Sequence, residues 1–265
     1  MKTIAITSGK GGVGKSTIVA NLAFALSEMG KRVMVLDADL GLGNIDVLFD
    51  LRPKYTLEHV IKGERGLKEI ILEGPKGIKV IPAPSGVEEM AALNQQQRLL
   101  LIEEFRSVAD GVEILLIDTA PGISSNVIFF NLAASKVVVV VSPDPCSMVD
   151  SYALMKVMAL SHSKRLFDLL VNNVRDEREA SRIYERLDTL ASHFLGATIN
   201  YFGYVPSDPK VPMASRRKRL VVEAFPESKA SSRLFEIARK ISEMPERELS
   251  PEMVFFSEER SWERP

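Results

Sequence analysis

Residues 9–17 read Gly9-Lys10-Gly11-Gly12-Val13-Gly14-Lys15-Ser16-Thr17, and this stretch decides the fold. It follows the apolar run Thr3–Thr7 and opens the helix-patterned stretch Lys15–Met29. The pattern G-x-x-x-x-G-K-[ST] is matched in full, in the strand–loop–helix context that it requires. Glycines let a backbone curl so that its N–H groups face an anion, and the start of a helix adds partial positive charge. An ordinary glycine turn that caps a helix is the alternative, but the full match favours a phosphate-binding loop.

The loop predicts a partner for each of its side chains. Lys15 is expected to reach the β- and γ-phosphates of a nucleotide, and the Ser16 hydroxyl is expected to bind Mg²⁺. Thr17 is expected to contact the α-phosphate. The predicted nucleotide contacts in this loop are Gly11, Gly12, Val13, Gly14, Lys15, Ser16 and Thr17.

Short apolar runs alternate with longer helix-patterned segments along the chain. The runs are Thr3–Thr7, Val33–Asp37, Ile78–Ile81, Ile114–Asp118, Val137–Val141, Leu166–Val171 and Tyr201–Val205. Most are apolar at consecutive positions, which is typical of strands in a parallel sheet covered on both faces. The helix-like stretches are Lys15–Met29, Gln95–Ala109, Ser125–Ala134, Met148–Leu160, Glu177–Leu195 and Ser231–Ile241. We therefore predict an α/β fold with a single doubly wound, mostly parallel sheet flanked by helices.

The composition is that of a globular protein without a strong overall charge. The chain has 265 residues, of which 46% are apolar and 26% are charged, and its formal net charge is −1. No global electrostatic attraction to nucleic acid or anionic lipid is therefore expected, and such binding would need a local patch. The single cysteine, Cys146, fits a reducing compartment. No apolar run is long enough for a signal peptide or a spanning helix, so we expect a cytoplasmic protein.

Lys10 makes the loop similar to that of a known family. The sequence K-G-G-V-G-K-S-T, from Lys10 to Thr17, resembles the deviant P-loop of MinD and ParA-type ATPases. The resemblance implies an Mg²⁺-dependent ATPase that binds ATP and ADP, in which the extra lysine crosses a dimer interface and touches the partner's nucleotide. A cation supplied in this way offsets charge on the transferring phosphoryl group. The alternative is that Lys10 is a solvated loop lysine.

Three aspartates end predicted strands. Asp37 and Asp39 follow Val35-Leu36, and Asp118 follows four apolar residues, which is the Walker B pattern. Carboxyl ends of parallel strands converge on the ligand crevice of such folds, whereas helix capping is the alternative role. The resemblance implies that Asp39 orients the attacking water and that Asp118 holds Mg²⁺ through a bound water. The expected catalytic residues are Lys10, Lys15 and Asp39, and the expected metal site is Ser16, Asp39 and Asp118.

Two later strand ends carry polar residues that the family places around adenine. Asn172 follows Leu170-Val171, and Pro206-Ser207-Asp208 follows Val205. An asparagine amide both donates and accepts, as an adenine edge requires. The resemblance implies a base pocket of Asn172, Pro206 and Asp208, although turn residues at strand ends would have the same composition. The N-K-x-D-like motif of many GTPases is absent from the sequence.

The resemblance extends over residues 1–243, which we expect to form the ATPase domain. Residues 37–48, 51–55, 118–127 and 142–154 look like those of the flagellar-number regulators of the FlhG/FleN type. Their likeness implies an ATP-dependent homodimer with slow hydrolysis that controls flagellar number or placement. The implied partners are an FlhF-type GTPase, a switch-ring protein or a transcription regulator. A MinD-like division-site regulator and a ParA-like partition ATPase are the alternatives. A metabolic ATP-dependent enzyme ranks last, because the sequence shows no additional catalytic domain or group of nucleophilic residues.

Two features depart from the usual family pattern. The chain begins at its first predicted strand, so the N-terminal extension of some relatives is expected to be missing. Residues 244–265 are expected to form a tail, and from Pro251 to Pro265 it carries four glutamates against two arginines. This balance works against peripheral contact with anionic membrane lipid, whereas Phe255, Phe256 and Trp262 still call for an apolar partner. Three partners are equally favoured for these aromatic side chains, namely membrane lipid, the ATPase domain of the same chain and another protein.

One basic run raises the question of nucleic acid. Arg216-Arg217-Lys218-Arg219 would suit contact with DNA phosphates. A run of four basic residues is more often a solvated face, and we favour that interpretation.

Overall fold

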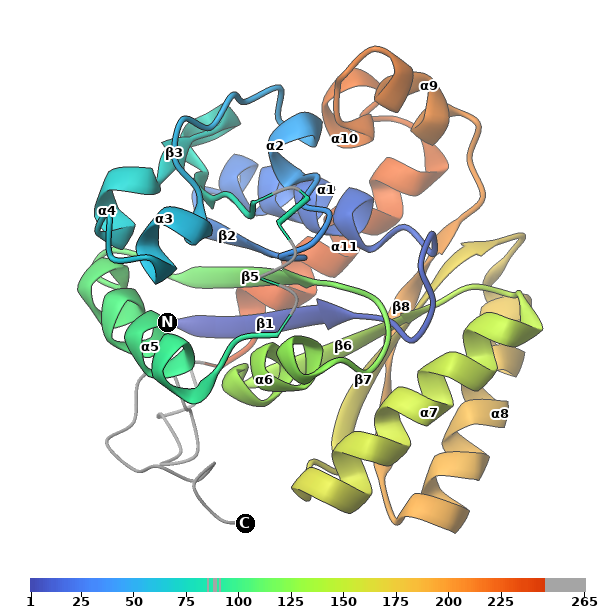
Figure 1. Ribbon diagram of the computed structural model, residues 1–265. Coiled ribbons are helices and arrows are strands. Elements are labelled where there is room, and N and C mark those ends of the chain that lie inside the picture. Colours follow the sequence, from blue (N-terminus) through green and yellow to red (C-terminus); the bar gives the residue numbers. More distant parts are fainter. Residues whose placement is uncertain (85, 88–89, 91, 246–265) are drawn as a thin grey trace.

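The computed structural model describes residues 1–84, 86–87, 90 and 92–245, and within them one sheet of eight strands forms the centre (Figure 1). The strands are β1 (Lys2–Thr7), β2 (Val33–Ala38), β3 (Leu72–Glu73), β4 (Lys79–Ile81), β5 (Ile114–Thr119), β6 (Lys136–Val141), β7 (Leu166–Val174) and β8 (Thr198–Pro206). Their order is β3-β4-β2-β5-β1-β6-β7-β8, and only the β3–β4 pair is antiparallel. The predicted doubly wound, mostly parallel sheet is confirmed.

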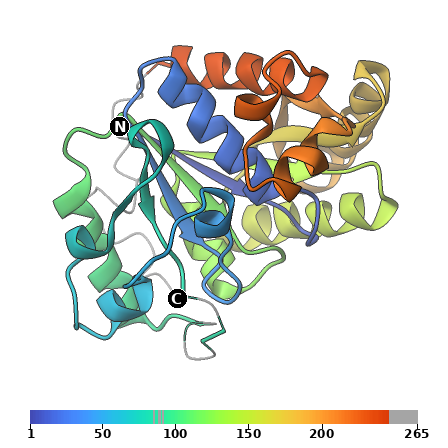
Figure 2. The ribbon, with the colours of Figure 1, turned by 90° about the horizontal axis from the view of Figure 1, so that it is seen from above.

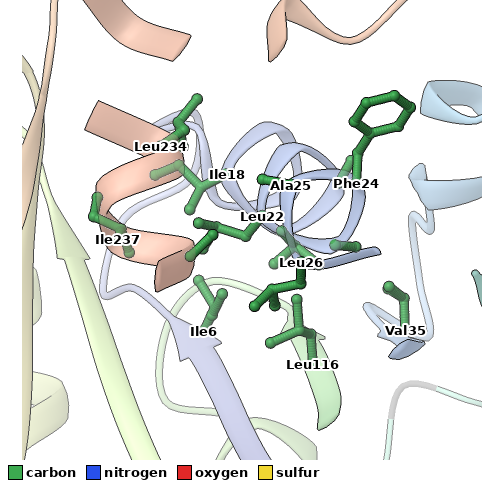
Figure 3. Close-up of a cluster of buried hydrophobic side chains, with 14 of the residues drawn as sticks. Ile6, Ile18, Leu22, Phe24, Ala25, Leu26, Val35, Leu116, Leu234 and Ile237 are labelled. Atoms are coloured by element: carbon green, nitrogen blue, oxygen red, sulfur yellow. The ribbon is translucent and has the colours of Figure 1, made fainter. Parts of the chain in front are cut away.

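Helices cover both faces of the sheet, as Figures 1 and 2 show from two directions. The helical segments are α1 (Lys15–Glu28), α2 (Ile45–Leu48), α3 (Leu57–Ile61), α4 (Leu67–Ile70), η1 (Pro75–Gly77), α5 (Gln95–Val108), α6 (Ser125–Ala133), α7 (Pro145–His162), α8 (Glu177–Leu195), α9 (Lys210–Arg216), α10 (Val221–Ala224) and α11 (Lys229–Glu243). On one face, α1 and α11 pack with alternate strand residues such as Ile6 and Leu116 (Figure 3). The opposite face is covered by α3 to α8. Strands buried on both faces explain the consecutive apolar positions in the sequence.

The direction of winding reverses at β1, which lies between β5 and β6. The chain passes from β1 to β2 on one side and later from β5 across β1 to β6 on the other. The loops that leave β1 and β5 therefore meet at the carboxyl edge, where ligands bind in open α/β sheets. In register, Ile6 of β1 lies beside Asp118 of β5.

Several short elements were not predicted from the sequence. They are β3, η1, α2, α3, α4, α9 and α10, each of two to seven residues. The longer helices extend close to their predicted bounds, although α7 begins at Pro145 rather than Met148. None of the helices in the described part of the chain combines the length and apolar character needed to cross a bilayer. The tail predicted at residues 244–265 stays a prediction, because residues 246–265 lie outside the described residues.

Candidate nucleotide site

The loop between β1 and α1 is shaped by close contacts at two glycines. Gly14 has φ 95°, in the left-handed region, and a Cβ there would lie 2.5 Å from Nδ2 of Asn172. A Cβ at Gly9 would lie 2.0 Å from the backbone carbon of Asp150, at the start of α7. Both positions therefore exclude a side chain, and the loop is clamped between α7 and the end of β7.

The first turn of α1 is open to an anion. Its N-cap is Gly14, which offers no side-chain cap, and the first turn contains no acidic residue. Backbone N–H groups at a helix start need an acceptor, and phosphate oxygens are suitable ones. The contact of residues 11–17 with a nucleotide stays a prediction.

Lys15 lies at the beginning of α1 with its side chain turned into the protein. It is 7% exposed, and burial lowers the pKa of its ammonium group, opposed by the negative charges of Asp118 and Asp39. No carboxylate of the described residues lies within ion-pairing distance of it. A buried cation without a paired anion is costly, so this position favours an anionic ligand.

Asp118, at the end of β5, is the matching anion. It is 1% exposed, it accepts a hydrogen bond from the Ser16 hydroxyl, and its Oδ1 has no partner among the described residues. Burial raises the pKa of Asp118 to about 7, while Ser16 and Lys15 lower it and Asp39 raises it further. An orphaned carboxylate oxygen beside a serine hydroxyl is a suitable donor set for Mg²⁺, which takes oxygen ligands and keeps several waters.

Asp37 lies beside Asp118 in the register of β2 and β5, but its carboxylate is already occupied. It accepts hydrogen bonds from the backbone N–H groups of Asp39 (3.2 Å), Asn44 (2.9 Å) and Ile45 (3.0 Å). Burial and the charge of Asp118 raise the pKa of Asp37 to about 8, and these three bonds oppose the shift. Asp37 therefore shapes the loop after β2 and is not free for the ligand.

Asp39 stands at the more open end of that loop. Its Oδ1 accepts the backbone N–H of Leu42 at 3.1 Å, and its side chain is half-buried. Its charge also influences Lys15 and Asp118. The structure thus brings together Lys15, Ser16, Asp39 and Asp118, the group that the sequence predicted.

Lys10 has a partner that the sequence did not predict. Its Nζ forms an ion pair with Asp144, and the two side chains are 38% and 40% exposed. Their hydrogen bond raises the pKa of Lys10 and lowers that of Asp144. Asp144 also caps α7, because its Oδ1 accepts the backbone N–H of Cys146 at 3.0 Å. Lys10 is therefore neither simply solvated nor buried.

The residues predicted for the base pocket are held by the fold. Nδ2 of Asn172 donates to the carbonyl of Val13 at 2.7 Å, which fastens β7 to the loop. Asp208, after β8, accepts the backbone N–H groups of Lys210 (2.9 Å) and Ala230 (3.1 Å). The backbone N–H of Ser207 donates to the carbonyl of Val174 at 2.7 Å. Asn172 thus lies against the phosphate loop, whereas Asp208 connects the β8–α9 turn to α11.

Large apolar side chains surround the same carboxyl edge. Leu42 (68% exposed) and Val47 (58%) follow β2, Ile123 (53%) follows β5, and Val149 (66%) lies in the first turns of α7. We call these four residues the apolar rim. Exposed apolar residues gathered around one edge are typical of a surface that meets another protein.

Three of the four residues of the basic run after β8 have side-chain contacts within the chain. Lys218 pairs with Asp50 at 3.3 Å and Arg219 pairs with Glu223 at 3.1 Å. The Arg217 guanidinium lies 5.8 Å from the centroid of the Phe225 ring. Lys218 and its partner Asp50 are both largely exposed, and the interpretation of the run as a solvated face stays a prediction.

Comparisons with known proteins match most of the length of this chain. The ParA family model, described as NUBPL iron-transfer P-loop NTPase, matches residues 1–242. The antiactivator FleN of Pseudomonas aeruginosa is 41% identical over 92% of this chain and 88% of its own length. The flagellum site-determining protein YlxH of Helicobacter pylori is 35% identical over 89% of this chain and 80% of its own.

Solved structures give the same result for the fold. MinD in the MinC:MinD cell division protein complex of Aquifex aeolicus superposes with a TM-score of 0.73 and 27% identity, over 92% of this chain and 97% of that one. MinD of Pyrococcus horikoshii, solved with Mg-ADP, has a TM-score of 0.73 and 23% identity over 91% and 96%.

Proposed function

This chain belongs to the ParA family of P-loop NTPases, and from that premise we propose that it is an ATP-dependent, dimerising switch with slow, Mg²⁺-dependent ATP hydrolysis. One observation carries the proposal. Lys15 and Asp118 are buried without an ion-pair partner among the described residues, next to the start of α1, whose first turn has no side-chain cap and no acidic residue. A bound Mg-triphosphate would compensate both charges.

Each residue then has a distinct task. Lys15 and the N–H groups of residues 11–17 would bind the phosphates, and Ser16 and Asp118 would hold Mg²⁺. When bound, Mg²⁺ neutralises charge on the phosphate oxygens. Asp39, at the open end of its loop, would help to hold Mg²⁺ and would position the attacking water. Asn172, Pro206 and Asp208 surround adenine, with Asn172 using the part of its amide that Val13 leaves free.

Dimerisation brings the carboxyl edges of two copies together. The apolar rim would lose its exposure to water in such a dimer, which supplies the driving force. Lys10 would leave Asp144 and reach the phosphates bound by the partner subunit, where a cation stabilises the transition state. We further propose that residues 1–243 form this ATPase domain and that residues 244–265 are a separate tail.

The role in the cell that these relatives favour is control of flagellar number or placement. FleN is named an antiactivator and YlxH a flagellum site-determining protein, which supports a transcription regulator, a switch-ring protein or an FlhF-type GTPase as partner. A MinD-like or ParA-like role is the alternative. The intrachain contacts of the basic run weigh against DNA as the partner. Iron transfer is named in the family description, but iron–sulfur clusters are usually held by four cysteines and this chain has one. The cysteine content therefore does not favour this function. The proposed location is the cytoplasm, with peripheral contact at the inner face of the cell membrane.

The decisive experiment measures the size of the protein in solution with ATP and with ADP. We expect ATP and Mg²⁺ to convert the monomer to a dimer, and ADP to leave it monomeric. Lys10→Ala should bind nucleotide normally and stay monomeric, whereas Lys68→Ala, an exposed lysine on α4, should behave like the wild type. A Lys10→Ala protein that dimerises with ATP would exclude a role for this lysine across the interface.

A further inference from the structure

A second cluster of exposed apolar side chains lies at the opposite edge of the sheet. Leu160 (58% exposed) lies at the end of α7, Leu166 (41%) begins β7, and Leu190 (42%) and Phe194 (65%) lie in the last turns of α8. We call these four residues the apolar tip. It lies at the lower ends of α7 and α8 in Figure 1, away from the loop that follows β1.

Backbone contacts hold the three elements of the tip together. The N–H of Lys164 donates to Met158 at 3.1 Å, which closes the end of α7, and the N–H of Thr198 donates to Arg165 at 2.7 Å. Leu166 is therefore paired with the first residue of β8, directly after the end of α8. Leu190 and Phe194 are one helical turn apart and share a face of α8.

Basic side chains border the tip. Arg182 and Arg186 precede Leu190 by two turns and one turn on the same ridge of α8. Arg165 lies beside the end of α8, since a Cβ added at Gly196 would be 3.4 Å from its Nη1. We call these three exposed arginines the basic collar. Within the described ranges no carboxylate forms an ion pair with any of them. The acidic groups nearby on α8 are Glu185, which is exposed, and Asp188, which accepts the N–H of Ile199 at 3.4 Å.

This arrangement is unfavourable for the isolated protein. Arginines at i and i+4 repel each other, and the exposed apolar atoms lose no contact with water on folding. The formal net charge of the chain is −1, so a local surplus of positive charge is not a property of the whole surface. Both costs disappear if the tip enters an apolar layer while the collar meets anionic groups.

We propose that the apolar tip and the basic collar form a docking surface for an anionic lipid bilayer. Apolar side chains at the end of a molecule enter the boundary between headgroups and acyl chains, while arginines extend along it toward lipid phosphates. The surface is distinct from the nucleotide site and from residues 244–265, whose glutamates make them a poor anchor. The inference does not rest on ATP binding or on dimerisation.

The test is co-sedimentation of the full chain, without nucleotide, with vesicles made of equal parts phosphatidylglycerol and phosphatidylcholine. We expect binding to these vesicles that falls as salt is added, and little binding to pure phosphatidylcholine. Leu190→Ser with Phe194→Ser should weaken partitioning about tenfold, because two apolar side chains no longer leave water. Arg182→Gln with Arg186→Gln should weaken it about fivefold per arginine.

Two further variants keep the result interpretable. Arg216→Gln with Arg217→Gln removes the same charge from α9 and its end, and it should bind the vesicles like the wild type. Phe255→Ser with Phe256→Ser should also leave binding unchanged. The proposal is wrong if the wild type does not sediment with anionic vesicles. It is equally wrong if the tip and collar variants bind normally while the tail variant does not, since the lipid contact would then belong to residues 244–265.

Discussion

The carboxyl edge of the sheet has two halves, and their polar side chains differ in whether the protein itself supplies their partners. On the phosphate side, Lys15 has no ion pair among the described residues and Asp118 has one oxygen without a partner. On the base side, Asn172 and Asp208 are satisfied by backbone groups of Val13, Lys210 and Ala230. The phosphate side is therefore built to be completed by a ligand, whereas the base side is part of the scaffold.

This difference has a thermodynamic consequence. An unpaired buried charge destabilises the free protein, and a ligand that pairs with it recovers that free energy on binding. Backbone N–H groups paired with a side-chain acceptor stabilise the protein whether or not a ligand is present. Removing a charge on the phosphate side should therefore weaken nucleotide binding without lowering the stability of the free protein. Removing an acceptor on the base side should instead lower that stability.

The largest expected effect is that of Lys15→Met on nucleotide binding. Methionine fills much of the same buried volume without the charge, so the fold should persist while affinity for Mg-ATP falls by about a hundredfold or more. Thermal unfolding without nucleotide should occur at or above the wild-type temperature, because a desolvated ammonium group is gone. Calorimetric titration with ATP and Mg²⁺ measures the affinity. Near-normal affinity would contradict the assignment of the phosphate side.

The next largest expected effect is the contribution of Asp118 to the pH dependence of the free energy of unfolding. Burial raises the pKa of Asp118 to about 7, above the value of about 4 expected in the unfolded chain. The folded state then binds more protons between these values, so the free energy of unfolding falls as pH rises, by up to about 1.4 kcal/mol per pH unit for this group. The stabilising contribution is complete below about pH 4 and is lost as pH passes about 7.

Asp118→Asn should flatten this dependence. The variant should be more stable than the wild type near neutral pH, and denaturant titrations without Mg²⁺ at several pH values from acid to neutral would measure the difference. A residual slope is expected from Asp37, whose pKa is raised to about 8 by burial. A wild-type stability that increases with pH through this range would show that Asp118 is well stabilised as an anion in the free protein.

On the base side, Asp208→Ala should lower stability. Two backbone N–H groups lose their acceptor, at a cost of about 1–2 kcal/mol. Asp110→Ala, an exposed aspartate after α5, is the matched control and should change stability little. Denaturant unfolding of the three proteins gives the comparison. If Asp208→Ala is as stable as the control while nucleotide affinity falls, Asp208 serves the base and not the scaffold.

The features that the sequence predicted are those whose residues lie close together in the chain. Gly9 to Thr17 is one contiguous motif, and Asp118 follows a buried strand directly, so their meeting at the switch of strand order could be predicted. The partner of Lys10 is 134 residues away in the sequence and that of Asn172 is 159 away, and only tertiary packing decides such pairs. Helices of four or five residues, such as α2 and α3, are too short to show the repeating apolar pattern by which a helix is recognised in a sequence.

The smallest expected effect is that of Asp144→Asn, and it rests on the proposed dimerisation. Asparagine still caps α7 but no longer pairs with the charge of Lys10, so the lysine is released at little cost to the helix. Because the pair is exposed, we expect no more than a few-fold fall in the protein concentration needed for ATP-dependent dimerisation. Combining it with Lys10→Ala should add nothing, which a double-mutant cycle would test by sedimentation. If Asp144→Asn weakens dimerisation instead, then Asp144 acts within the dimer, and the ion pair of the free subunit is not what restrains Lys10.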